Sequence, residues 1–129
     1  MSPKSPAKPT DAELEILQIL WEKSPETVKY VHRKINETKP VVYTTTLKLM
    51  QIMTKKQLLR RMGEGRKHVY EPVIKRGETQ TAMINKLINN VFNGSASRLV
   101  MQVLGHHKPS EEELTEIQRF IENLEREEK

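Results

Sequence analysis

The sequence contains no cysteine and no long run of apolar residues. Without cysteine the chain has neither a disulfide framework nor a thiolate metal site, and a thiol redox switch is excluded. No apolar stretch approaches the roughly 18 residues of a membrane-spanning helix, and the first residues lack the apolar middle region of a secretory signal. We therefore expect a cytoplasmic protein.

Aromatic residues and glycine are also scarce. The six aromatic side chains are too scattered to stack on single-stranded nucleic acid, and Gly63-Glu64-Gly65 is too short for a phosphate-binding loop. No candidate nucleophile sits in a recognisable elbow, so we do not expect an enzyme. His106-His107 is the only histidine pair, and adjacent helical residues point about 100° apart, so we expect no metal and no other cofactor.

Charge is distributed unevenly along the chain. Residues 1–76 hold 16 lysines and arginines against 8 acidic residues, whereas residues 77–129 hold 6 against 9. A basic half joined to an acidic, amphipathic half suggests a polyanion-binding module attached to a part with another task. The alternative is a mildly basic protein whose charged faces are simply solvated.

The N-terminal half predicts a short tail followed by three helices. Residues 1–9 hold three prolines and two lysines, which indicates a flexible basic tail. Thr10 and Glu13 form a capping-box pattern before apolar residues at helical spacing, so a helix is predicted over residues 11–23. Ser24-Pro25 predicts a second helix over 25–37, and a third is expected over 44–56.

A different pattern follows the third helix. The segments from Leu58 to Met62 and from Arg66 to Tyr70 are typical of two short strands around a glycine-containing turn, with Pro72 ending the second strand. Three helices followed by a basic hairpin is the element order of a winged helix-turn-helix, here over residues 10–74. The expected fold class is mainly α with a small β-hairpin wing.

Residues 75–129 are predicted to be helical and to form a dimerisation region. A wide apolar stripe ends at Asn93-Gly94, a short helix follows over about 95–104, and a capping-box pattern at Ser110 and Glu113 opens a last helix with heptad spacing. Three short helices cannot cover this much apolar surface, so we expect a homodimer. The residues predicted to dimerise are Leu87, Val91, Leu99, Val103, Leu114, Ile117, Ile121 and Leu124.

The third helix carries candidate DNA-reading residues. It is expected to bury Thr46, Leu49, Met50 and Met53 against the first two helices. The step of about 100° per residue then exposes the opposite face, whose threonine, lysine and glutamine side chains can bond base edges or a phosphate. The residues predicted to contact DNA from this helix are Thr44, Thr45, Lys48, Gln51 and Lys55. A solvated polar face is the alternative.

The hairpin carries four cations that suit phosphate contact: Arg60, Arg61, Arg66 and Lys67. Only Glu64 opposes them within the turn, so wing and third helix together predict binding to double-stranded DNA. His32 and His68 are expected at the surface or at an interface. The competing hypothesis is a dimeric helical protein-interaction module whose winged domain no longer binds DNA.

Several motifs also appear in a familiar order: Thr10-Asp11-Ala12-Glu13, Ile19-Leu20-Trp21, Tyr43-Thr44-Thr45-Thr46, Lys55-Lys56, Glu64-Gly65-Arg66, Val69-Tyr70 with Pro72, and Phe92-Asn93-Gly94. In this order and spacing the chain resembles the penicillinase repressor family, known as BlaI/MecI, which includes the copper-responsive CopY repressors. The resemblance covers nearly the whole chain from Thr10. It implies a bacterial homodimeric transcriptional repressor of the antibiotic-resistance or stress-regulator type. In such a repressor the third helix binds the major groove of an inverted-repeat operator, and the C-terminal helices form the dimer.

Two features depart from the family pattern. Gln57 stands where the family usually has a glycine between the third helix and the first strand, so we expect a local change in that turn. In the antibiotic-responsive members, induction cuts an Asn-Phe bond, and the matching pair here is Gln102-Val103. A sensor protease is therefore a partner only if it accepts this pair. The copper-responsive mechanism uses C-terminal cysteines and is excluded here.

Overall fold

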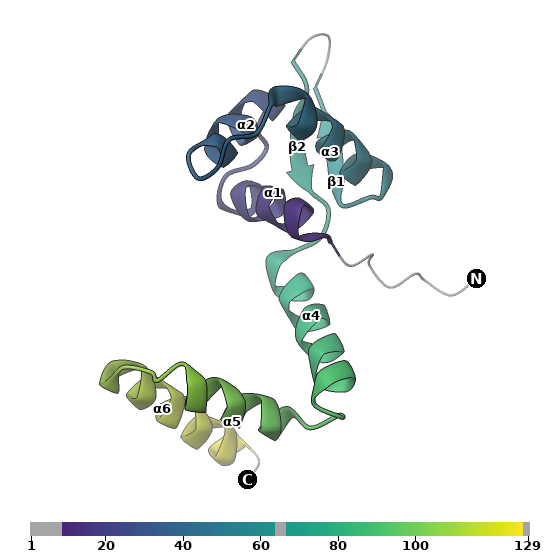
Figure 1. The fold of residues 1–129 in the computed structure, drawn as a ribbon. Coiled ribbons are helices and arrows are strands. Elements are labelled where there is room, and N and C mark those ends of the chain that lie inside the picture. The colour runs from purple at the N-terminus through teal and green to yellow at the C-terminus, as the bar shows by residue number, and fades with distance from the viewer. Residues whose placement is uncertain (1–8, 64–66, 128–129) are drawn as a thin grey trace, which may run out of the picture. The chain divides into compact units, whose positions relative to one another are not determined.

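The computed structural model describes residues 9–63 and 67–127 (Figure 1). The chain divides into two compact units, one ending at Met83 and the other beginning at Ile84, and each is described by itself. The predicted basic tail lies outside the described residues except for Pro9, as does the middle of the predicted hairpin turn.

Helix α1 (Asp11–Glu22) begins at the predicted capping box. The Thr10 hydroxyl accepts a hydrogen bond from the Glu13 N–H at 3.2 Å, and the Glu13 carboxylate accepts one from the Thr10 N–H at 2.9 Å. These bonds satisfy backbone donors for which the helix itself has no acceptor, so they define where it starts. The apolar residues that α1 buries completely are Ile16, Leu17 and Leu20.

Helix α2 (Val28–Asn36) begins three residues later than the sequence predicts. Its cap is Thr27, whose hydroxyl accepts a bond from the Tyr30 N–H at 3.1 Å. The reason is tertiary, because the backbone of Glu26 pairs with Tyr70 through two hydrogen bonds of 3.0 and 2.8 Å. This bridge keeps residue 26 extended and overrides the local start signal at residue 25.

Helix α3 (Tyr43–Lys55) confirms the third predicted helix, and an antiparallel hairpin follows it. The hairpin consists of β1 (Leu59–Met62) and β2 (Val69–Pro72). The second strand starts three residues after the predicted Arg66 and includes Pro72, which pairs with Leu59. Proline has no N–H to donate, which suits the end of a ladder, and the Val73 N–H continues the pairing by bonding to the Leu58 carbonyl at 2.9 Å.

In the turn between α3 and β1, one residue has a left-handed backbone conformation. Gln57 has a φ of 67°, and the Leu58 N–H then donates to the Met53 carbonyl at 2.8 Å, which closes the end of α3. A residue with a Cβ atom pays roughly 1–2 kcal/mol for this backbone conformation, whereas glycine adopts it freely. Glutamine therefore occupies a turn that suits glycine.

The core of the first unit lies where the three helices meet the hairpin. The helices contact one another, α3 packs along β1, and α1 packs against β2 (Figure 1). Trp21 is half-buried beside this core, and its indole N–H donates to the Ile74 carbonyl at 3.0 Å. The buried apolar residues are Ile16, Leu17, Leu20, Val28, Val31, Ile35, Met50, Met53, Leu58, Leu59 and Tyr70.

The rest of the described chain is helical, as predicted. Helix α4 (Arg76–Val91) starts in the first unit, where Thr79 is buried, and continues into the second, which also contains α5 (Ala96–His106) and α6 (Glu111–Glu127). Ser110 and Glu113 form the predicted capping box, with bonds of 3.1 and 3.0 Å. From residue 84 to residue 127 no side chain is buried. Among the described helices, none is long and apolar enough to cross a membrane.

Candidate nucleic-acid interface

Helix α3 presents a row of polar side chains, here called the α3 row: Thr44, Lys48, Gln51 and Lys55. All four are exposed, and their spacing of three or four residues places them along one side of the helix. The opposite side faces the core, where Thr46, Met50 and Met53 have no exposed surface. Leu49, which was predicted to be buried as well, is half-buried. Thr45 is exposed beside the row.

Two further residues on α3 are exposed although the sequence analysis did not select them. Tyr43 is 44% exposed and Ile52 is 41% exposed. The helical step of about 100° places Ile52 beside Lys48 and Lys55, so the same arithmetic that identified the row could have found it. The Tyr43 ring meets the His32 ring edge-on, with centroids 5.4 Å apart. The exposed side of α3 therefore offers apolar and aromatic surface together with its polar groups.

The N-terminal end of α3 has no side-chain cap. Val42 occupies the cap position and makes no side-chain hydrogen bond there. Backbone N–H groups in the first turn of a helix lack helical acceptors and can receive an anion. The exposed hydroxyls of Thr44 and Thr45 lie in this same turn. This end of the helix therefore has the donors that a phosphate oxygen needs.

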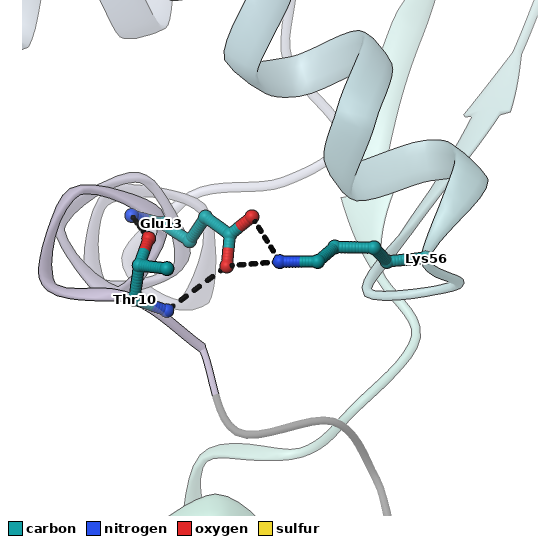
Figure 2. A network of polar contacts seen from close by, with 3 residues as sticks. All are labelled: Thr10, Glu13 and Lys56. Carbon is teal, nitrogen blue, oxygen red and sulfur yellow. Dashed lines mark hydrogen bonds and ion pairs between the residues drawn. The ribbon is translucent and has the colours of Figure 1, made fainter.

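The C-terminal end of α3 is tied to α1 by an ion pair (Figure 2). The ammonium of Lys56 lies 3.0 and 2.8 Å from the Oε1 and Oε2 atoms of the Glu13 carboxylate, and Oε1 also accepts the Thr10 N–H. The Glu13 side chain is only 2% exposed and that of Lys56 is 36% exposed. Burial by itself raises the pKa of Glu13. The hydrogen bonds from Lys56 and Thr10, with the ammonium charge, outweigh it, and the pKa lies below its ordinary value.

Strand β1 carries two of the predicted phosphate contacts on opposite faces of the hairpin. Successive side chains on a strand alternate, so Arg60 points away from the face that Arg61 shares with Tyr70. Arg60 forms an ion pair with Glu71, its partner across the ladder, which the sequence analysis had not considered. Arg61 is exposed, and no ion pair joins it to an acidic side chain among the described residues.

The other predicted phosphate contacts lie between the two strands. Lys67 is exposed just before β2, whereas Arg66 and Glu64 lie outside the described residues. His68 is half-buried, and its Nδ1 atom has no hydrogen-bond partner within the described part of the chain. Because α3 packs along β1, the α3 row and the wing arginines belong to neighbouring elements of one compact unit (Figure 1).

In the second unit, none of the residues predicted to dimerise is buried. Six of the eight are between 40% and 66% exposed, and Leu99 and Ile117 are half-buried. Met101 on α5 and Phe120 on α6 are also strongly exposed, at 70% and 63%. The heptad spacing in the sequence did not include these two residues. Within residues 84–127 the helices therefore leave a large apolar surface exposed.

Helix α5 carries the pair Gln102-Val103 and ends at the histidine pair. Gln102 and Val103 are both exposed on the helix surface. His106 is the last residue of α5 and His107 is its C-cap. Over residues 9–63 and 67–127, no group of three or more histidine, aspartate or glutamate side chains is placed to hold a metal ion.

Three helices and an antiparallel hairpin, with an exposed polar row on the third helix, define a winged helix-turn-helix, a class of DNA-binding fold. The model of the penicillinase repressor family matches residues 9–123. The chain belongs to this family, whose members are transcriptional repressors of the BlaI type.

Individual relatives agree with this assignment. The penicillinase repressor of Bacillus licheniformis is 26% identical over 113 residues, which are 88% of each chain. The transcriptional regulator BlaI of Mycobacterium tuberculosis is 31% identical over 87 residues, covering 66% of this chain and 63% of that protein. The solution structure of the DNA-binding domain of the repressor BlaI superposes with a TM-score of 0.51 at 28% identity. It covers 59% of this chain and 93% of that domain.

Proposed function

We propose that this chain is a homodimeric repressor that binds an inverted-repeat operator in double-stranded DNA. In this proposal α3 lies in the major groove and the wing contacts the phosphate backbone. The observation that carries the proposal is the α3 row, which is exposed along a helix whose other side buries Thr46, Met50 and Met53 completely. The core does not use these side chains, and their donors and acceptors match those of base edges. Membership in a family of repressors supports the same function.

The residues of the α3 row have complementary tasks in this proposal. Lys48 and Lys55 are seven residues apart, so about 10 Å of helix axis separates them. Lysine can donate to guanine O6 and N7, and Gln51 can pair with adenine. Ile52, exposed between the two lysines, offers apolar contact for a thymine methyl group.

The wing would contribute affinity without sequence preference. Arg61 and Lys67 are exposed cations, whereas the charge of Arg60 is already balanced by Glu71. Each phosphate that a cation neutralises steepens the fall of log affinity with log salt by roughly 0.9. We therefore assign the larger share of backbone binding on β1 to Arg61.

A second copy of the chain is the proposed cover for the apolar surface of the C-terminal helices. Among residues 84–127 no side chain is buried, and the exposed apolar residues include Val91, Met101 and Phe120. A two-fold symmetric dimer buries the same surface on both subunits. It also presents two recognition helices related by that symmetry, which is what an inverted repeat requires.

Footprinting of the purified full chain on the DNA upstream of its own gene tests target, symmetry and half-site spacing together. We expect a protected inverted repeat whose half-sites are about one helical turn, or a multiple of it, apart. A salt titration on the same duplex separates the repressor from the interaction module, because the repressor requires a steep salt dependence. If the chain ignores duplexes at low ionic strength, the proposal is wrong.

Two substitutions test the division of tasks between helix and wing. Lys48→Ala should reduce the preference for the protected sequence over a random duplex, by about 1–3 kcal/mol if the lysine contacts a base. Arg61→Ala should weaken binding to both duplexes alike, because phosphate contacts carry no sequence information. Lys86→Ala, an exposed change on α4, serves as the control. Equal losses of preference from Lys48→Ala and Arg61→Ala would contradict these roles.

A further inference from the structure

A chain of hydrogen bonds connects α2 to the beginning of α3. The Val41 N–H, just before α3, donates to Oδ1 of Asn36 at 2.9 Å. Nδ2 of Asn36 lies 2.9 Å from Nε2 of His32, and Nδ1 of His32 lies 3.1 Å from the hydroxyl of Thr46. We call these four residues the His32 relay. Because Thr46 has no exposed surface, the relay joins the turn before α3 to the buried side of that helix.

The relay determines the protonation state of the imidazole. A backbone N–H can only donate, so the Asn36 oxygen must face Val41 and the Asn36 NH₂ group must face His32. An NH₂ group is itself a donor, so Nε2 of His32 has to present a lone pair. The ring proton then sits on Nδ1 and donates to Thr46. The arrangement therefore requires a neutral imidazole in the Nδ1–H form.

A second proton on His32 is incompatible with the complete relay. It places an N–H at Nε2 against the NH₂ group of Asn36, so that two donors face each other. Turning the Asn36 amide over repairs this contact. The NH₂ group then faces the Val41 N–H, which loses its acceptor. One hydrogen bond is lost in either arrangement.

No ion pair with His32 is present among the described residues to compensate the added proton. From α3 the ring is faced by the phenol ring of Tyr43 and the hydroxyl of Thr46. From α2 it is faced by the Asn36 amide, and the next residue along that helix is the cation Arg33. Within the described chain, no carboxylate of α1, α2 or α3 forms an ion pair with the ring.

We propose that His32 is a positioning residue for α3, and that a second proton on its ring weakens sequence-specific DNA binding. Imidazole side chains in general change charge between about pH 5 and pH 8, so measurements at the two ends of this range test the proposal. His32 acts through Thr46 and through the turn at Val41, which set where the first turn of α3 lies. Residues at the start of a recognition helix contact the bases in helix-turn-helix proteins. The consequence for DNA rests on the function proposed above.

The tautomer can be measured without DNA. Nitrogen chemical shifts of the histidine rings in the full chain at pH 8, assigned with the spectrum of His32→Gln, report which ring nitrogen carries the proton. We expect the Nδ1–H form for His32. An Nε2–H form, or a charged ring at pH 8, would overturn the relay whether or not the protein binds DNA.

The effect on recognition is measured as a ratio of affinities. The two duplexes, of about 30 base pairs, carry the footprinted sequence and a scrambled sequence of the same composition, and both are titrated at pH 8 and pH 5.5. The wild-type preference should fall about three- to tenfold at the lower pH, which corresponds to one net hydrogen bond. At lower pH the protein gains positive charge, which raises its affinity for any duplex. The ratio of the affinities for the footprinted and scrambled duplexes is insensitive to this general gain.

Variants distinguish positioning from a general structural effect. His32→Gln and Asn36→Ala should each give a preference that does not change between the two pH values. His107→Gln, at an exposed residue of the second unit, should keep the wild-type profile. Thermal unfolding at both pH values shows that each variant is folded. A wild-type ratio that is independent of pH, or a pH dependence that persists in His32→Gln, refutes the proposal. If the wild-type protein binds neither duplex, the proposed function fails, and the nitrogen shifts still decide the tautomer.

Discussion

The ion pair between Glu13 and Lys56 allows a quantitative prediction of stability. Lys56→Met keeps the side-chain stem but leaves a carboxylate that is 2% exposed with only the Thr10 N–H as a hydrogen-bond donor. Removing one partner of a fully buried pair costs roughly 3–5 kcal/mol. Because Lys56 itself is 36% exposed, water screens the pair, and we expect a loss of about 2 kcal/mol.

Removing the negative charge should cost less than removing the positive one. In Glu13→Gln an amide oxygen replaces the carboxylate oxygen that accepts the Thr10 N–H, because glutamine also completes a capping box. It loses the charge of the bond to Lys56, so we expect a loss of about 1 kcal/mol. The double variant Glu13→Gln/Lys56→Met leaves no unpaired charge in the interior. Its loss should therefore be smaller than the sum of the two single losses by about 1 kcal/mol.

Urea unfolding at pH 7, followed by tryptophan fluorescence, measures these differences. Trp21 is the only tryptophan of the chain and lies half-buried in α1, so its emission reports on the unit that contains the ion pair. Lys55→Met, at the exposed neighbouring residue, should change the free energy of unfolding by no more than about 0.5 kcal/mol. If Lys56→Met is as stable as this control, or if the two single losses simply add, the ion pair does not stabilise the fold.

The same pair predicts a pH dependence with a definite sign. The pKa of Glu13 in the folded protein lies below its ordinary value of 4.5, so the folded state favours the carboxylate. The corresponding stability is fully present above about pH 4.5 and is lost as the pH falls through the folded pKa. The difference in stability between the wild type and Glu13→Gln should therefore shrink below pH 4.5. A difference that grows on acidification would contradict this assignment.

Three further results are expected. Gln57→Gly should raise the free energy of unfolding by about 0.5–1 kcal/mol, because residue 57 has a φ of 67°, and a decrease would show that the turn holds no strain. Ile121→Asp should convert the proposed dimer to monomers in analytical ultracentrifugation, whereas Gln118→Asp should not; dimers in both would place the interface elsewhere. Arg61→Gln should reduce the slope of log affinity against log salt by about one. Arg60→Gln should reduce it less, since its charge is already paired, and equal effects would argue against that pairing.

Features that depend on neighbouring residues could be predicted from the sequence. The capping boxes at Thr10 and Ser110 were found because their bonds span three residues, and both are present. The exposure of the α3 row followed from the helical step alone, because the apolar residues of one face indicate the direction of the core. The order of the elements, and with it the class of fold, followed in the same way.

Features that depend on distant residues could not be predicted in this way. The start of α2 was misplaced because Glu26 pairs with Tyr70, which lies 44 residues further along the chain. The partner of Glu13 is 43 residues away, at the end of α3. Arg60 looked available for a phosphate until the register of the hairpin placed Glu71 opposite it.

The sequence by itself determined the winged element order, the polar row on α3 and the uncovered apolar seam of the C-terminal helices, because periodicity and capping act over a few residues. Tertiary structure decided which charges are neutralised and which groups the His32 ring meets. These properties depend on the distance between side chains that different elements carry, and on burial, which sets the strength of each electrostatic interaction. No local pattern encodes that distance, since it arises only when the elements pack.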